Sequence, residues 1–123
     1  MTVRRSRNSL FFFSEVSGSA EQGTLLPPVD VHRTRHGWLI KMELAGVKPD
    51  DVAIDLHDHL IRIHGARRDY TCDEVIRHQT MEIAYQPFVR VVELPRPVDA
   101  SQISLEFRDG MLLMRVTQSE ENS

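Results

Sequence analysis

The feature that most constrains this chain is an Asp-Gly pair between two runs of alternating apolar residues, within residues 103–116. Asp-Gly favours a two-residue type I′ turn, because both central positions of that turn need a positive φ angle. With Asp109 and Gly110 in the turn, three apolar pairs fall on one face of a hairpin: Ile103 with Val116, Leu105 with Met114, and Phe107 with Leu112. A two-stranded ribbon with one apolar face is not stable alone, so the other apolar runs are predicted to be strands that cover it.

Residues 52–65 predict a second hairpin of the same kind. A turn at residues 58–59 places Asp55 opposite Arg62 on the outer face, and this opposite-charge pair favours the register. The same turn makes two apolar pairs on the inner face: Ile54 with Ile63, and Leu56 with Ile61. Both faces of the hairpin therefore predict one register.

Further alternating runs at residues 29–34, 38–44 and 88–94 predict more strands, separated by turns rich in glycine and proline. No stretch shows a convincing helical period. About seven short strands with close turn signals predict an all-β protein, an antiparallel β-sandwich whose domain spans residues 27–117. A short polar tail follows at residues 118–123.

Two segments do not fit this sandwich. Residues 1–26 lack a sustained period and predict a flexible N-terminal arm. Four adjacent apolar residues lie within that arm: Leu10, Phe11, Phe12 and Phe13. They either fold back onto the domain or form an exposed contact segment, and the residues alone leave both alternatives open.

The second segment, residues 66–87, is too long for an ordinary connection inside a compact sandwich. It is expected to be functional, disordered or docked on another chain. Residues 80–85 within it are able to form one short strand.

Composition excludes several classes of function. The net charge of −3 and the presence of only two lysines argue against a nucleic-acid surface. No apolar run approaches the length of a membrane-spanning helix, and the apolar run near the start is too short for an export signal. A single cysteine, Cys72, fits a reducing compartment, so a cytoplasmic protein is expected.

Nothing in the sequence predicts an enzyme. No serine or cysteine lies in a recognisable nucleophile motif, and no glycine-rich loop is present that would cradle a nucleotide phosphate. His57 and His59 flank a tight turn, but only neighbouring acids and no cysteine accompany them. We therefore expect no catalytic residue, no cofactor and no metal.

Four pieces of the chain, in order, resemble the α-crystallin domain of small heat-shock proteins. Leu44-Ala45-Gly46-Val47 resembles the family's Leu-Pro-Gly-Val loop, and Gly65-Ala66-Arg67 resembles its Gly-x-Arg. Phe88 to Pro95 and the Asp109-Gly110 region, which is similar to the family's Ala-x-x-x-Asn-Gly-Val-Leu signature, complete the match. The resemblance covers about residues 28–117 and implies an immunoglobulin-like sandwich, typical of bacterial members.

The resemblance also implies a function, an ATP-independent holdase that binds partially unfolded proteins and limits their aggregation under stress. Client contacts are then expected on the arm and in a groove between residues 52–57 and 103–107; the groove residues are Val52, Ile54, Leu56, Ile103, Leu105 and Phe107. In bacterial and plant members of the family the long loop carries a strand that is exchanged between partners. This implies a homodimer interface at Met81, Ile83, Tyr85 and Arg90.

Several residues depart from the family pattern. Ala45 stands where proline is usual and Leu105 where alanine is usual, and the loop before Phe88 lacks the common Glu-Arg pair. The tail has no Ile-x-Ile, so a homodimer or small homo-oligomer is expected. For Arg90 two alternatives remain, an outward-facing charge and a pair with an acid of the partner's loop.

A different class of function also remains open. A β-sandwich co-chaperone of the CS-domain type binds one folded partner through a fixed surface. An aromatic arm with a long loop, which such an adaptor does not need, favours the holdase.

Overall fold

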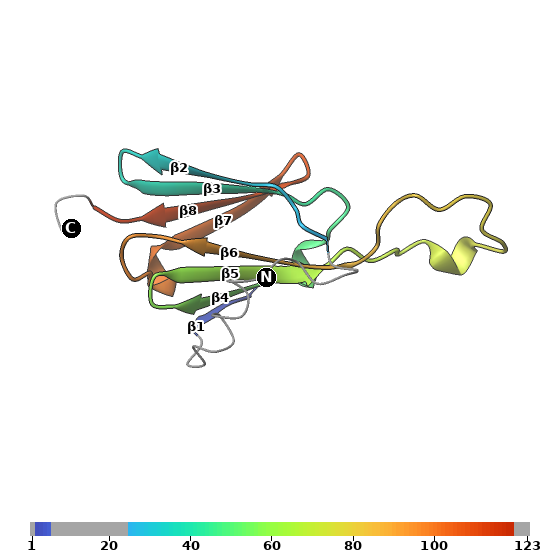
Figure 1. Cartoon of the computed structure of the whole chain (residues 1–123), viewed down its shortest axis with the longest axis horizontal. Coiled ribbons are helices and arrows are strands. Elements are labelled where there is room, and N and C mark those ends of the chain that lie inside the picture. Colours follow the sequence, from blue (N-terminus) through green and yellow to red (C-terminus); the bar gives the residue numbers. More distant parts are fainter. Residues whose placement is uncertain (1, 6–24, 120–123) are drawn as a thin grey trace.

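The computed structural model describes residues 2–5 and 25–119 of the chain, and Figure 1 shows two layers of strands. One sheet has the strand order β1-β4-β5-β6, and the other has the order β2-β3-β8-β7. All neighbouring strands are antiparallel except β1 and β4, which are parallel. The predicted all-β sandwich is therefore confirmed.

The first sheet contains β1 (Thr2–Arg5), β4 (Val52–His57), β5 (Leu60–Ala66) and β6 (Pro87–Glu93). The second contains β2 (Val29–Thr34), β3 (Gly37–Glu43), β8 (Met111–Thr117) and β7 (Ile103–Arg108). Three single 3-10 turns lie in the connections: Pro49–Asp51, Cys72–Glu74 and Ala100–Gln102. No helix in these described ranges has the length and apolar character needed to cross a membrane.

Both predicted hairpin registers are confirmed. In β7–β8 the three apolar pairs form as expected, and Asp109 and Gly110 have φ angles of 55° and 75°, as a type I′ turn requires. In β4–β5 Ile54 lies opposite Ile63 and Asp55 lies opposite Arg62. Local alternation and turn chemistry were therefore sufficient to predict which residues meet.

The core lies between the two sheets. Its most deeply buried side chains come from the inner faces of the central strands: Ile40, Met42, Ile54, Leu56, Ile61, Ile63, Leu112 and Met114. The three inner residues of β7 are only half-buried, because β7 is an edge strand of its sheet in the described part of the chain. One side of the sandwich is thus less well covered than its centre.

The described residues form eight strands where about seven were expected, and β1 lies in the segment that was predicted to be an arm. The residues of β1 read Thr-Val-Arg-Arg, which shows no apolar alternation to reveal a strand. Its pairing with β4 depends on a strand more than 40 residues away, so local pattern does not predict it. Residues 6–24, including Leu10 to Phe13, lie outside the described residues.

Between β5 and β6 the chain leaves the sandwich, and Figure 1 shows this excursion extending well beyond the end of the sheets. Within it the structure has the turn Cys72–Glu74 and no strand, so the strand predicted at residues 80–85 does not form within this single chain. The predicted exchange of that segment with a partner stays a prediction. We refer to residues 67–86 as the long loop.

Candidate interaction surfaces

The predicted groove has two unlike walls. On the β4 side, Val52, Ile54 and Leu56 belong to the core, with exposed fractions of 3%, 0% and 2%. On the β7 side, Ile103, Leu105 and Phe107 are half-buried against that core. Among the described residues, the apolar side chains on the β7 side are therefore more exposed than those on the β4 side.

β1 lies on the β4 side of the predicted groove. β1 pairs along the edge of β4 in a parallel register, Val3 beside Ile54 and Arg4 beside Asp55, and Val3 packs half-buried against the core. At the far end of β4 a hollow of about 350 Å³ remains, lined in part by Leu56, Val98 and Ala100. Sequence reasoning missed this pairing, because it assigned no strand to the first residues.

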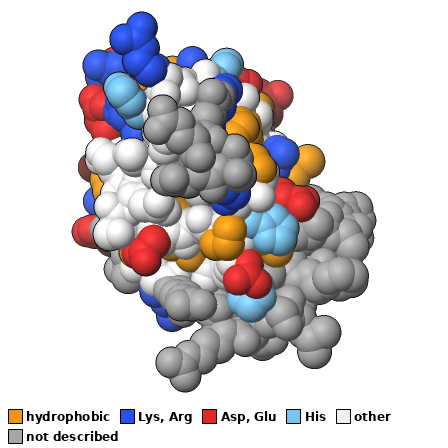
Figure 2. Space-filling view, turned by 90° about the vertical axis from the view of Figure 1, so that its left-hand side faces the viewer, with side chains coloured by type: hydrophobic (Ala, Val, Ile, Leu, Met, Phe, Trp, Pro, Cys, Tyr) orange, Lys and Arg blue, Asp and Glu red, His pale blue; other side chains and the backbone are white. Residues whose placement is uncertain are grey.

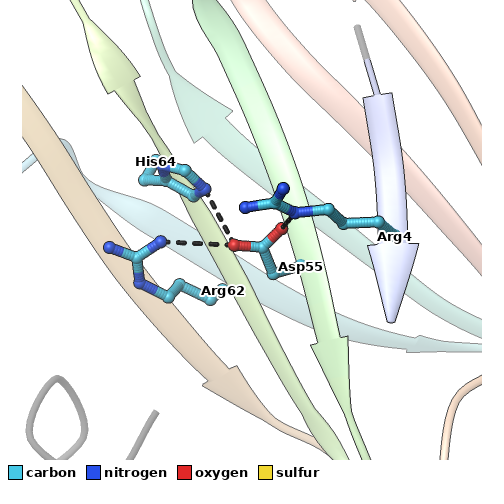
Figure 3. A network of polar contacts seen from close by, with 4 residues as sticks. All are labelled: Arg4, Asp55, Arg62 and His64. Atoms are coloured by element: carbon cyan, nitrogen blue, oxygen red, sulfur yellow. Dashed lines mark hydrogen bonds and ion pairs between the residues drawn. The ribbon is translucent and has the colours of Figure 1, made fainter. Parts of the chain in front are cut away.

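Asp55 was predicted on the outer face of the hairpin, and the structure shows that it is only 1% exposed there. Figure 3 shows three basic side chains converging on its carboxylate, Arg4 from β1 and both Arg62 and His64 from β5. Arg4 Nε donates to Oδ1 at 2.6 Å, whereas His64 Nε2 and Arg62 Nη1 contact Oδ2 at 3.0 and 3.4 Å. The predicted Asp55–Arg62 pair is thus confirmed, but as part of a buried cluster.

The pKa values of this cluster follow from burial and charge. Burial alone would raise the pKa of Asp55, but the hydrogen bond from Arg4 and the charges of His64 and Arg4 outweigh it and lower the pKa. The pKa of His64 is also lowered, first by burial and then by the charge of Arg62. Asp55 is therefore held as a carboxylate under the β1 strand.

The long loop is the most apolar exposed part of the described chain. The three predicted contact residues Met81, Ile83 and Tyr85 are exposed by 60%, 63% and 39%. Three more exposed apolar residues were not predicted: Tyr70, Val75 and Ile76. These residues are of the same types as those in the core and differ from them only in exposure. Residue type alone therefore did not predict that they are exposed.

Arg67 holds the neck of the long loop. Its backbone N–H donates to the carbonyl of Gln86 at 3.0 Å, and its guanidinium donates to the carbonyls of Ala84 and Ala45 at 2.8 and 3.3 Å. The motif at residues 65–67 therefore meets the loop at residues 44–47 in space. Sequence reasoning noted both motifs but did not predict that Arg67 joins them.

Arg90 is not an outward-facing charge. It lies opposite Ile63 and on the same face of β6 as Phe88 and Val92, both buried, and its Nη1 donates to the carbonyl of Pro27 at 2.8 Å. Leu25 also bridges to Phe88, so residues 25–27 run along part of the free edge of β6. The predicted pairing of Arg90 with a partner's acid stays a prediction.

Neither end of the sandwich offers a metal centre within the described residues. His57 lies 4.0 Å from Asp58, and His59 lies 3.2 Å from Glu93, so the two imidazoles have different acidic neighbours. No group of three His, Cys, Asp or Glu side chains converges in the described ranges. Figure 2 shows the end of the sandwich opposite the long loop, where basic, acidic and histidine side chains are interspersed with small hydrophobic groups.

Comparison with known proteins gives one consistent result. The sequence model of the Hsp20/alpha crystallin family matches residues 30–123. Small heat shock protein C2 of Rickettsia felis is 24% identical over 110 residues, which cover 89% of this chain and 71% of that protein. Small heat shock protein HspE of Bradyrhizobium diazoefficiens is 29% identical over 104 residues, 84% of this chain and 66% of that protein.

Solved structures agree with these sequence relatives. Heat shock protein 16.0 from Schizosaccharomyces pombe superposes with a TM-score of 0.71 and 26% identity, covering 80% of this chain and 92% of that one.

Proposed function

This chain belongs to the Hsp20/alpha crystallin family, a family of chaperones without enzymatic chemistry, and on that premise we propose that it is an ATP-independent holdase. Its clients are partially unfolded proteins, which expose apolar surface and unpaired strand edges. A cytoplasmic location accords with the free, exposed thiol of Cys72.

The observation that carries the proposal is the apolar surface of the long loop, together with the half-open β7 wall. Ile76 is 101% exposed and Ile83 is 63% exposed, although both are residue types that normally lie in a core. Exposed apolar groups of this kind mark protein contact sites. Each client contact is weak, so several sites acting together supply the affinity.

The proposed assembly is a homodimer in which residues 80–85 add to the β2 edge of a second copy. Within the described residues β2 pairs with β3 alone, and Val31, on the inward face beside buried Ile40, is 42% exposed. The corresponding edge of β6 is partly covered by residues 25–27. β2 therefore offers both free backbone groups and uncovered apolar surface to an incoming strand.

Aggregation suppression tests the function. An unrelated enzyme is heated without ATP, with and without a few-fold excess of this protein, and light scattering is followed. We expect suppression by the full chain, and weaker suppression when Phe11, Phe12 and Phe13 are replaced together by Ser. No suppression by the wild-type chain would instead favour an adaptor of the CS-domain type.

Sedimentation tests the assembly. Ile83→Ser is expected to shift the mass toward the monomer, because it removes an apolar side chain from the proposed exchanged strand. Ile76→Ser, a substitution of the same type in the same loop but outside residues 80–85, is the matched control and should leave the mass unchanged. Equal effects of the two substitutions would contradict strand exchange and indicate nonspecific hydrophobic association through the long loop.

A further inference from the structure

The edge of β4 is occupied by a short and unusual strand. β1 has four residues, is parallel to β4 and pairs with no other strand among residues 25–119. A short parallel pair of strands contributes little stability by itself. Side-chain contacts must therefore supply most of the free energy that holds β1 on β4.

Two side chains of β1 make specific contacts there. Val3 packs half-buried against the core, and Arg4 Nε reaches Asp55 Oδ1 at 2.6 Å. The side chain of Arg4 is itself 67% exposed, whereas that of Asp55 is 1% exposed. A surface cation thus completes the hydrogen bonding of a buried anion.

The two oxygens of Asp55 have different partners. His64 and Arg62, both on β5, approach Oδ2, whereas Oδ1 takes its hydrogen bond from the strand that lies on the β4 edge. A buried carboxylate oxygen without a donor is costly. Any strand that replaces β1 therefore gains most when it brings a cation to the position of Arg4.

We propose that the β4 edge is an acceptor for extended client segments in which a β-branched apolar residue precedes an arginine, and that β1 is the resident occupant they displace. Backbone pairing supplies affinity for any extended chain, and Asp55 supplies the preference for a basic residue. This inference rests on the proposed holdase function and names the class of segment that the β4 edge selects.

A client segment can compete with β1 for this edge, because the Arg4–Asp55 contact is accessible from solvent. The exposed guanidinium of Arg4 is reachable from solvent, and its partner carboxylate stays in place through Arg62 and His64. An acidic segment would bring a like charge to Asp55, which disfavours it in the same register. The edge therefore discriminates by charge and not only by apolar contact.

Peptide binding to the full-length chain tests the proposal. The probes are fluorescent peptides that carry Thr-Val-Arg-Val-Thr and a twin with Glu in place of Arg, followed by anisotropy. Arg4→Ala weakens the resident strand, so we expect this variant to bind the Arg peptide at least about tenfold tighter than the wild type does, and the Glu peptide no better. Arg115→Ala, which removes the exposed pair with Glu106 in the other sheet, is the matched control and should behave as the wild type.

Asp55→Asn in the Arg4→Ala background should abolish the preference for Arg over Glu. If this variant does not fold, by circular dichroism, the Arg and Glu twins on the Arg4→Ala variant alone decide the question. Equal binding of the twins, or an equal gain in Arg115→Ala, would overturn the proposal. The proposal would also be overturned if the particle mass of the Arg4→Ala variant rose and the variant bound neither peptide. In that case a second copy of the chain would occupy the β4 edge.

The same protein samples separate this inference from the proposed function. If aggregation suppression is intact while the twins bind equally, the β4 edge does not select basic segments but the holdase stands. If suppression is absent in the wild type, the holdase itself is wrong.

Discussion

The sandwich and the long loop contain the same kinds of apolar residue in opposite environments. Ile61 and Ile63 of β5 are fully buried, whereas Ile76 and Ile83 of the long loop are exposed by 101% and 63%. The two isoleucines of β5 belong to the core, and those of the loop lie outside it. The difference teaches that apolar content alone does not assign a segment to a core.

The sharpest test of this difference compares two isoleucines. Ile63→Ala is expected to lower the free energy of unfolding by about 2–5 kcal/mol, because a cavity opens in the core. Ile76→Ala is expected to change it by less than about 0.5 kcal/mol, because its side chain contacts solvent. Urea denaturation of both variants measures the contrast, and equal losses would show that the loop packs in solution.

The boundary between the two regions lies at Gly65, near the end of β5. A Cβ at this position would lie 1.9 Å from the backbone oxygen of Asp51 and 3.0 Å from Cζ of Phe88. Gly65→Ala should therefore destabilise the chain by about 1–3 kcal/mol through overpacking. Thermal unfolding measures this, and an unchanged melting temperature would place the end of the rigid sandwich earlier in the chain.

A smaller effect is expected at the tight turn between β7 and β8. Gly110 has a φ angle of 75°, a region that side chains with a Cβ rarely adopt. Gly110→Ala should lower stability by about 1 kcal/mol in urea denaturation. An Asp109→Asn control should be nearly neutral, because Asn-Gly favours the same turn, and a large loss in the control would point to a role for the Asp109 carboxylate.

The smallest expected effect is a pH dependence confined to the sandwich. His64 faces Arg4 of β1, Asp55 of β4 and Arg62 of β5, with Val89 opposite it on β6. Because the pKa of His64 is lowered in the folded chain, only the unfolded chain takes up this proton as the pH falls through about 6.5, and stability decreases.

His64→Gln should flatten the fall in stability that begins below about pH 6.5, measured by urea denaturation across pH. The loss linked to the lowered pKa of Asp55 begins only below about pH 4. His78→Gln, at an exposed histidine of the long loop, is the matched control and should leave the curve unchanged. If the free energy of unfolding fell equally with pH in the wild type and in His64→Gln, His64 would not be the group responsible.

Sequence reasoning succeeded where interactions are local. The pairs Phe107 with Leu112 and Ile54 with Ile63 follow from a turn and a two-residue period, which act over a few residues. For Arg90 it did not foresee that the side chain lies on the inward face of β6 and donates to the distant carbonyl of Pro27. The client groove predicted between β4 and β7 stays a prediction, and the position of β1 along β4 was not foreseen.

The sequence by itself determined the two hairpins, their registers and the excess length of the long loop, because turn chemistry and side-chain period are properties of neighbouring residues. Only the tertiary structure decided that Thr2–Arg5 lies on the β4 edge and that Asp55 is buried beneath Arg4. A strand of four mostly polar residues carries no period of its own. Its place depends on a free edge and a buried carboxylate that exist only once the sandwich has formed.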